Sequence, residues 1–233
     1  MRQLQVLAWV VMVALGLNAL LGAIGIASDI SYHDLIRRAL SGRYVSLSTA
    51  SSADDRVQTI ARVEIGLYIV AGVLFIAWFR LAYKNVARLG VAGTRWSARW
   101  AVGGWFVPVL NLIRPKAMMN DIWRGSDPDL PIGGTLSGGN PPWLYQVWWG
   151  VWILGWIGDR LTYRSFGNAQ TLPALSTATV ELTVSDAVDL IGAVVAIAVV
   201  YSLTSRQRKR ASALAAIDPS VGTLASAPDD DPG

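Results

Sequence analysis

Residues 4–27 read LQVLAWVVMVALGLNALLGAIGIA, an apolar run of 24 residues without a charged side chain. A transmembrane α-helix needs about 20 such residues to cross the hydrocarbon core of a bilayer. The basic residue before the run also fits a signal peptide. The run is, however, longer than the apolar part of such peptides, and further apolar runs follow it. We therefore predict an uncleaved first membrane span.

The composition of the whole chain favours the same class of protein. Of its 233 residues, 53% are hydrophobic and only 15% are charged, whereas a soluble domain carries about 25% charged residues. The 11 Trp side chains suit membrane–water interfaces, where one face of the ring meets lipid and the N–H meets water. The formal net charge of +4 points to anionic lipid headgroups and not to nucleic acid, because the bases lie beside the apolar runs.

The rare residue types narrow the chemistry. The chain has no Cys and a single His, which excludes disulfides, thiolate metal sites and any site built from several histidines of one chain. It also lacks a glycine-rich phosphate loop in a strand–helix context and a nucleophile elbow. We therefore expect no metal, no cofactor and no identifiable catalytic residue.

Three further runs predict helices that cross the bilayer, at about 65–89, 141–161 and 186–204. Glu64 lies at the start of the first of these, and Arg80 lies in its second half. Both placements suit the helix dipole. The expected fold is all-α: a polytopic membrane protein with four transmembrane helices in one domain, residues 1–210. The remaining residues, 211–233, are rich in small and acidic side chains and predict a disordered cytoplasmic tail.

The segment 96–126, between the second and third spans, has a different pattern. Its apolar run, 101–112, is too short to cross a bilayer, and Pro108 interrupts it. The next piece begins with Pro115 and predicts an amphipathic helix. We expect an element of helix, proline and helix, either re-entrant or lying in the interface, with Asn111 bonding the backbone freed by the proline. The residues expected to face lipid are Met118, Met119, Ile122 and Trp123; those expected to face water are Lys116, Asn120, Asp121 and Arg124.

The distribution of basic residues predicts the orientation, because cytoplasmic loops are enriched in Lys and Arg. One side of the four predicted spans carries 13 of the 20 bases, including the cluster at the end of the last span, and the other carries 7. The larger number lies with both termini and with 96–126. We therefore expect a multi-pass protein of the cell membrane with both termini in the cytoplasm. The outer connections, 28–62 and 162–183, should be polar loops, the first containing a short amphipathic helix.

A family resemblance is carried by two strings, RLAYKNVARLG (80–90) and WSARWAVGGWFVPVLNLIRPKAMMNDIWRGSDP (96–128). They resemble the signature of the domain of unknown function 4328 family, small integral membrane proteins chiefly of actinobacteria. The resemblance covers about residues 60–210. The family has no established biochemical role, so the resemblance implies no catalytic residue, but it does imply that the central segment is the defining element. The signature residues, which are also candidate binding residues, are Arg80, Tyr83, Asn85, Trp105, Pro108, Asn111, Pro115, Trp123 and Arg124.

Three functions remain open from the sequence. The first is a non-enzymatic scaffold or accessory subunit, alone or as a homo-oligomer, whose cytoplasmic face engages lipid or a partner membrane protein. The second is a small oligomeric transporter or channel, whose path would be lined by the broken segment at Pro108 and by the intramembrane polar residues Asn18, Glu64 and Asp189. The third is a membrane enzyme acting on a lipid-linked substrate, with Tyr83, Asn85, Asn111, Asp121 and Arg124 at the cytoplasmic interface.

Overall fold

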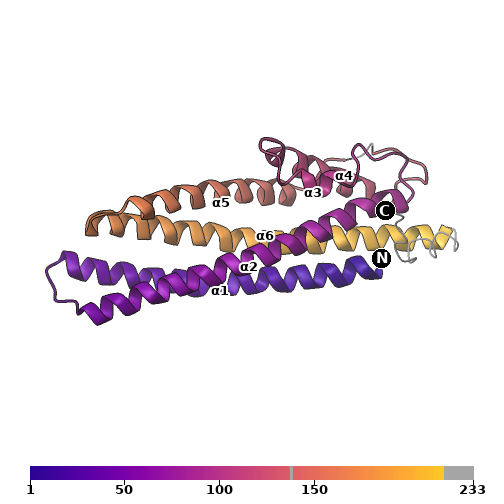
Figure 1. Ribbon diagram of the computed structural model, residues 1–233. Helices are drawn as coiled ribbons and strands as arrows, with labels where there is room; N and C mark the ends of the chain where they lie inside the picture. Colours follow the sequence, from indigo (N-terminus) through magenta and orange to yellow (C-terminus); the bar gives the residue numbers. More distant parts are fainter. Residues whose placement is uncertain (137–138, 218–233) are drawn as a thin grey trace. The chain divides into compact units, whose positions relative to one another are not determined.

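A computed structural model describes residues 1–136 and 139–217, and every regular element within them is a helix. This confirms the predicted all-α class. Three of the helices are long and apolar enough to cross a membrane, namely α1, α2 and α6. α5 is not among them, so the fourth span stays a prediction. In chain order the elements are α1 (Arg2–Leu40), α2 (Leu47–Arg88), α3 (Trp100–Gly103), the 3-10 helix η1 (Leu110–Leu112), α4 (Arg114–Gly125), α5 (Trp143–Asn168) and α6 (Leu172–Ile217) (Figure 1).

The long helices run well beyond their apolar stretches. The predicted polar loops over 28–62 and 162–183 are therefore wrong, and the connections are only 41–46 and 169–171 (Figure 1). Both connections end in a side chain that caps the next helix: Ser46 Oγ accepts from the Thr49 N–H at 3.2 Å, and Thr171 Oγ1 accepts from the Ala174 N–H at 3.3 Å. Such caps satisfy backbone donors that have no partner within the helix.

Tertiary packing explains why these extensions are helical. Tyr32 and Ile36 of α1 pack with Ala53 of α2 in a small buried cluster beyond the apolar runs. Leu35, Val57 and Leu175 lie against the same cluster. The segment in which a separate short helix was expected is therefore part of a continuous α1, held through Leu35 and Ile36.

The described residues form two compact units. Unit 1 contains Met1–Val13, Gly72–Tyr145 and the part of α6 that begins at Ala198; unit 2 contains Ala14–Ala71 and Gln146–Ile197. The sequence predicted a single domain over 1–210. α6 continues to Ile217, so residues 211–217 are helical where the disordered tail was expected to begin. The rest of that predicted tail, 218–233, lies outside the described residues.

The core of unit 1 contains several aromatic side chains. Trp78 and Phe79 of α2 are fully buried, and Trp78 Nε1 donates to Thr204 Oγ1 of α6 at 3.1 Å. The Trp105 ring meets Phe75 and Phe79 edge-on, with centroids 6.0 and 5.9 Å apart. Such aromatic contacts add to the free energy gained from burying the rings themselves.

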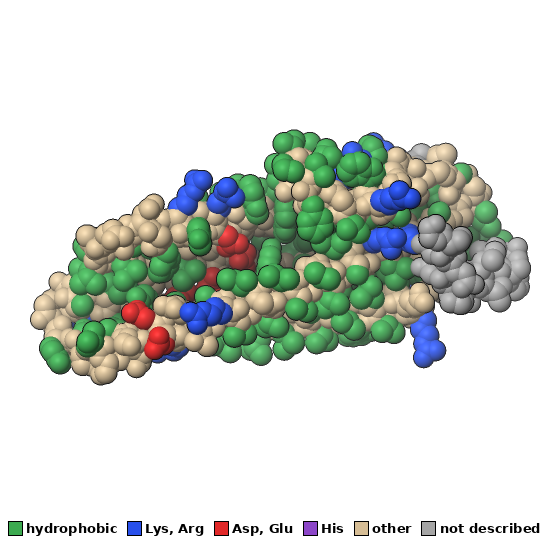
Figure 2. Space-filling view, in the orientation of Figure 1, with side chains coloured by type: hydrophobic (Ala, Val, Ile, Leu, Met, Phe, Trp, Pro, Cys, Tyr) green, Lys and Arg blue, Asp and Glu red, His purple; other side chains and the backbone are tan. Residues whose placement is uncertain are grey.

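Large apolar side chains are exposed along the three long apolar helices. On α1 they recur over its whole first half, at Val6, Trp9, Val13, Leu17, Leu20 and Ile24. Figure 2 shows hydrophobic side chains over much of the visible surface of the long helices. Soluble monomers rarely expose an apolar surface of this extent, so these helices suit lipid and not water as their surroundings.

Candidate functional site

The signature segment folds as two helices around an irregular turn. α3 ends at Gly103, and the chain then turns until η1 begins at Leu110. Val109 follows Pro108 with a positive φ of 66°, which is rare for a β-branched residue. The Asn111 N–H donates to Val107 O at 3.0 Å, and the Leu110 N–H donates to Pro108 O at 2.8 Å. These hydrogen bonds of the turn run between main-chain groups, and the side chain of Asn111 takes no part in them.

The apolar side chains of this turn point in two directions. Trp105 packs inward on α2, as described above. Three residues of the turn are largely exposed: Phe106 by 72%, Val109 by 68% and Ile113 by 62%. We call Phe106, Val109 and Ile113 the apolar tip. An exposed group of this kind marks a surface that contacts lipid or protein.

α4 does not face its surroundings as the sequence suggested. Met118, Met119 and Ile122, which were expected to face lipid, are fully buried, and so is Asp121, which was expected to face water. The helix is packed so closely on α2 that a Cβ on Gly125 would lie 2.5 Å from Val86 Cγ1. Its apolar face therefore contacts the protein, and the predicted lipid-facing assignment of these residues is wrong.

Arg114, at the start of α4, lies between two tryptophan rings. Its guanidinium carbon is 3.7 Å from the centroid of the Trp96 ring and 4.7 Å from that of Trp100. Gly104 leaves room for this arrangement, because a Cβ there would lie 3.0 Å from Arg114 Cγ. Cation–π contacts hold the charge without neutralising it. The Nη1 atom of Arg114 is buried without a hydrogen-bond partner among the described residues.

Tyr83, a signature residue of α2, anchors the loop that carries Trp96. Its hydroxyl accepts from the Trp96 N–H at 3.0 Å and donates to Trp96 O at 3.2 Å. The side chain is 1% exposed. Thr94 Oγ1 donates to the same carbonyl at 3.2 Å. Tyr83 therefore positions the Trp96–Arg114 stack and is not available to a substrate.

A second signature residue, Asn85, links α2 to α6. Its Nδ2 donates to Gln207 Oε1 at 3.4 Å, while Gln207 Nε2 donates to Ala82 O at 2.8 Å. Both side chains are buried. Pro115 is also buried, at the first turn of α4, and Arg80 is partly buried on α2. The structure thus gives Asn85 a role in holding α2 and α6 together.

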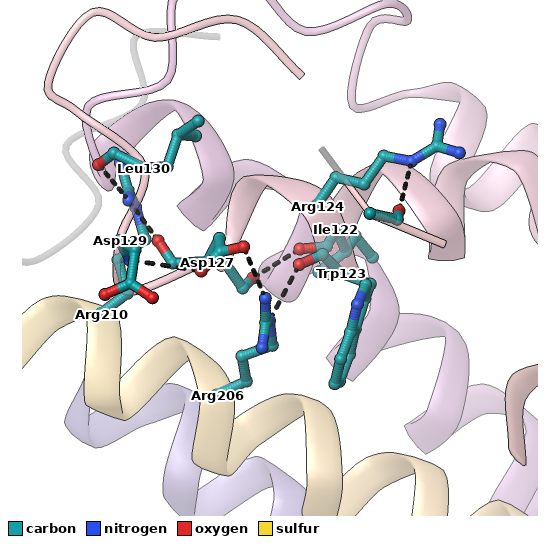
Figure 3. A network of polar contacts seen from close by, with 10 residues as sticks. Ile122, Trp123, Arg124, Asp127, Asp129, Leu130, Arg206 and Arg210 are labelled. Carbon is teal, nitrogen blue, oxygen red and sulfur yellow. Dashed lines mark hydrogen bonds and ion pairs between the residues drawn. The ribbon is translucent and has the colours of Figure 1, made fainter. Parts of the chain in front are cut away.

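Two arginines of α6 tie the end of α4 and the following loop to that helix (Figure 3). Arg210 Nε donates to Leu89 O at 2.9 Å, and its Nη1 donates to Leu130 O at 2.9 Å and to Asp127 O. Arg210 was expected to lie in the basic stop at the headgroups; it is instead fully buried. The sequence did not reveal this, because nothing distinguishes it locally from the neighbouring bases.

The other arginine, Arg206, contacts the signature residue Trp123. Arg206 Nε donates to Trp123 O at 3.2 Å, and its guanidinium lies 4.1 Å from the centroid of the Trp123 ring. Arg206 Nη2 also pairs with Asp127 Oδ2 at 2.9 Å. The neighbouring Arg124 points away, toward Gly139 O, at 3.4 Å (Figure 3). Asp127, in the loop after α4, is therefore part of the network.

Asp121 of α4 is an acid buried in unit 1. Its side chain is fully buried, and among the described residues it pairs with Arg95, whose Nη1 lies 3.5 Å from Asp121 Oδ1. Burial raises the pKa of Asp121, although Arg95 and Arg124 act in the opposite direction. Burial thus stabilises the neutral acid relative to an exposed carboxyl group.

We expect Asp121→Asn to make the protein less sensitive to pH. Because the folded-state pKa of Asp121 is raised, its contribution to stability is present at acidic pH and is lost as pH rises through the folded pKa. Thermal unfolding of the purified protein in detergent, over a pH series, should show the wild type losing stability toward neutral pH more steeply than the variant. Asp129→Asn is the control, because Asp129 is exposed. Equal pH slopes for wild type and Asp121→Asn would contradict this environment for Asp121.

Unit 2 contains a carboxylate cluster formed by Asp29 of α1, Glu64 of α2, Asp159 of α5, and Asp186 and Asp189 of α6. Glu64 Oε1 and Asp186 Oδ2 lie 2.6 and 3.4 Å from the position that a Cβ on Gly25 would occupy. The Asp29 and Asp186 carboxyl groups meet, as do those of Asp159 and Asp189. Figure 2 shows acidic side chains partly recessed among hydrophobic ones.

The cluster includes two of the three polar residues that the sequence singled out. Glu64 and Asp189 belong to it, but the third, Asn18, is satisfied elsewhere: its Nδ2 donates to Leu67 O at 3.2 Å and to Ala14 O at 2.9 Å. Asp29, Asp159 and Asp186 were missed as site residues. Each lies at the edge of an apolar run, where a single carboxylate suggests only a helix end.

Comparison with known proteins gives one match. The family model of the domain of unknown function 4328 (DUF4328) matches residues 41–205. No curated protein and no solved structure matches the chain. The matched range includes the end of α2, the apolar tip, α4, and four of the five residues of the carboxylate cluster. Since the match extends over most of the sequence, the chain belongs to the DUF4328 family.

Proposed function

We propose that this protein is a non-enzymatic membrane scaffold that binds anionic lipid headgroups at its cytoplasmic face. In this proposal α1, α2, α5 and α6 cross the cell membrane, both termini are cytoplasmic, and the apolar tip enters the inner leaflet without crossing it. The observation that carries the proposal is the exposure of Phe106, Val109 and Ile113 beside a group of bases.

The bases near the apolar tip in the sequence are suited to headgroups. Arg99, just before α3, is exposed. Arg114 follows directly after the tip, and its charge is held by two rings and not by an acid. Lys116 Nζ donates to Asn120 Oδ1 at 2.9 Å, and burial lowers its pKa to about 8. An apolar group flanked by positive charge is the pattern of interfacial membrane binding.

The depth of the apolar tip tests the proposal. The chain has no Cys, so Phe106→Cys and Ile113→Cys can each carry a single nitroxide label in the full protein reconstituted in lipid nanodiscs. Electron paramagnetic resonance should find both labels accessible to oxygen and protected from a water-soluble nickel complex, because apolar side chains at the tip lie below the headgroups. Asp129→Cys is the control and should be accessible to nickel. Nickel accessibility at position 106 equal to that at 129 would overturn the proposed docking.

The lipid specificity needs a second measurement on the same preparation. The nanodiscs contain both zwitterionic and anionic lipid. When part of the lipid is removed from them, the wild-type protein should keep anionic lipid bound. Arg99→Gln should retain roughly 2-fold less, since each base near a charged surface contributes about 1 kcal/mol at most. Arg43→Gln, in the loop between α1 and α2, is the matched control. The same retention by wild type and Arg99→Gln would remove Arg99 from the proposed headgroup site.

The number of spans can be tested by labelling from each side of the membrane. Tyr44→Cys and Gln170→Cys lie in the two connections of unit 2, and Ile132→Cys follows α4; all three positions are exposed. With four spans, an impermeant maleimide added to intact cells should label positions 44 and 170 but not 132. Labelling of 170 only after the membrane is opened would show that α5 does not cross.

A transporter or channel is the second candidate, and one observation favours it. Four helices of unit 2 each contribute at least one acidic side chain to the carboxylate cluster, and intramembrane carboxylates commonly mark ion or proton pathways. The enzyme alternative has weaker support, because Tyr83, Asn85 and Asp121 are buried and engaged by the protein itself.

A further inference from the structure

The carboxylate cluster of unit 2 is built into spaces left by helical glycines. A Cβ on Gly25 of α1 would lie 2.6 Å from Glu64 Oε1, and one on Gly155 of α5 would lie 2.6 Å from Asp189 Oδ1. Real Cβ atoms do not approach other atoms so closely, so any larger residue would displace these carboxyl groups. The acidic side chains thus occupy defined positions between the helices.

The buried members of the cluster lack partners that could hold their charge. Asp29 is only 3% exposed, and its Oδ2 has no hydrogen-bond partner among the described residues. Glu64 Oε1 is likewise buried without a partner in that part of the chain. The carboxyl group of Asp29 faces Asp186 and Glu64. Its buried Oδ2, which has no partner among the described residues, therefore lies within the cluster.

The ion pairs found among the described residues lie outside the cluster and join bases to Asp34, Asp121 and Asp127. Arg56 of α2 lies next to the cluster, but its Nε donates to Ser28 Oγ at 3.0 Å and its Nη2 to Ser31 Oγ at 3.4 Å. Tyr68, also of α2, faces Asp159 and Asp189 with a neutral hydroxyl.

Carboxyl groups in contact with one another cannot all be ionised. A hydrogen bond between two carboxyl groups requires a proton on one of them. The pKa at which this proton is lost is a property of the pair and not of either residue alone. A bound metal ion would be the other way to offset the charge. Among the described residues, however, no group of three or more His, Cys, Asp or Glu side chains is arranged to hold a metal ion.

We propose that the carboxylate cluster is a proton-binding site in which the Asp29–Asp186 pair and Asp189 each hold a proton at neutral pH. Asp159 is exposed and accepts a hydrogen bond from Ser185 Oγ at 2.8 Å, so the cluster meets water on this side. Asp189 and Asp186 lie next to Asp159, and Asp29 and Glu64 lie next to Asp186. The site is independent of the lipid-binding role proposed for unit 1.

Infrared difference spectroscopy of the full protein in nanodiscs tests this site directly. A protonated carboxyl group has a C=O stretching band that is absent from a carboxylate and shifts on exchange into heavy water. The wild type should show such bands at neutral pH and lose them as the pH is raised. Asp186→Asn and Asp189→Asn should each lose one of these bands. Asp34→Asn is the control, because Asp34 is exposed and paired with Arg38 at 2.7 Å.

Two further measurements complete the test. Gly25→Ala removes no carboxyl group, but its Cβ displaces Glu64 Oε1. This variant should therefore shift the titration midpoint of the bands without removing them. Addition of sodium, potassium or magnesium ions at constant pH should leave the wild-type bands unchanged. The absence of protonated carboxyl bands at neutral pH, or their loss on adding one of these ions, would overturn the proposal.

Discussion

Replacing Arg210 with Met is expected to lower the free energy of unfolding by roughly 3–5 kcal/mol, because it removes a buried charged donor from three carbonyl groups. The acceptors are Leu89 O at the end of α2, and Asp127 O and Leu130 O in the loop after α4. Met fills a similar volume, so the loss reflects hydrogen bonding more than packing. Thermal or denaturant unfolding of the detergent-solubilised protein would measure it.

The neighbouring Arg208 provides a matched control, because it is exposed on the same helix. Arg208→Met should change the free energy of unfolding by no more than about 0.5 kcal/mol, as is usual for surface positions. Arg210→Lys should recover only part of the loss, since an ammonium group lacks the planar fork that reaches several carbonyls at once. Equal stability of Arg210→Met and Arg208→Met would show that Arg210 does not hold the loop.

The second large effect is expected for Gly125→Ala, which should destabilise the protein by about 1–3 kcal/mol through overpacking. The added Cβ would lie 2.5 Å from Val86 Cγ1 and 3.2 Å from Leu136 Cδ2. Val86 is fully buried in α2 and cannot move away easily. α4 must therefore shift outward, which should also expose the buried Met118. The same unfolding measurement applies.

Gly72→Ala is the control for this substitution, because a Cβ on Gly72 would meet nothing within 4 Å in the middle of α2. It should leave stability unchanged or raise it by up to about 1 kcal/mol, since Ala favours a helix more than Gly does. Comparison of Gly125→Ala with Gly72→Ala separates the effect of close packing on stability from the effect of helix propensity. If Gly125→Ala were as stable as Gly72→Ala, the contact between α4 and α2 would be looser than described.

The long apolar helices α1, α2 and α6 were predictable, but the helix ends were not. An uncharged run such as 4–27 indicates a helix by its length alone, because backbone groups in lipid must bond within the segment. The extensions to Leu40 and from Leu47 depend on packing between Ile36 and Ala53, which is a tertiary contact. Local sequence there is rich in Ser and Thr and favours a loop, so composition gave the wrong prediction.

The candidate sites show the same limit. The sequence indicated that Tyr83 and Asn85 matter, but it could not supply their partners, Trp96 and Gln207, which come from other elements. The sequence pattern of α4 does not say whether an apolar face meets lipid or protein; Met118 is buried in the protein. The carboxylate cluster requires four helices to bring their acids together, and each acid alone looks ordinary.

Val109 connects the conformation of the turn to the lipid around it. Its positive φ places a β-branched side chain in the left-handed region, at a conformational cost of about 1–3 kcal/mol. Transfer of a valine side chain from water into hydrocarbon contributes about 1.5–3 kcal/mol in the opposite direction. With the tip seated in the leaflet, these two quantities nearly offset each other, whereas in water the strain is uncompensated. The bilayer would then stabilise the positive φ of Val109, and the same turn in water would favour a different backbone conformation.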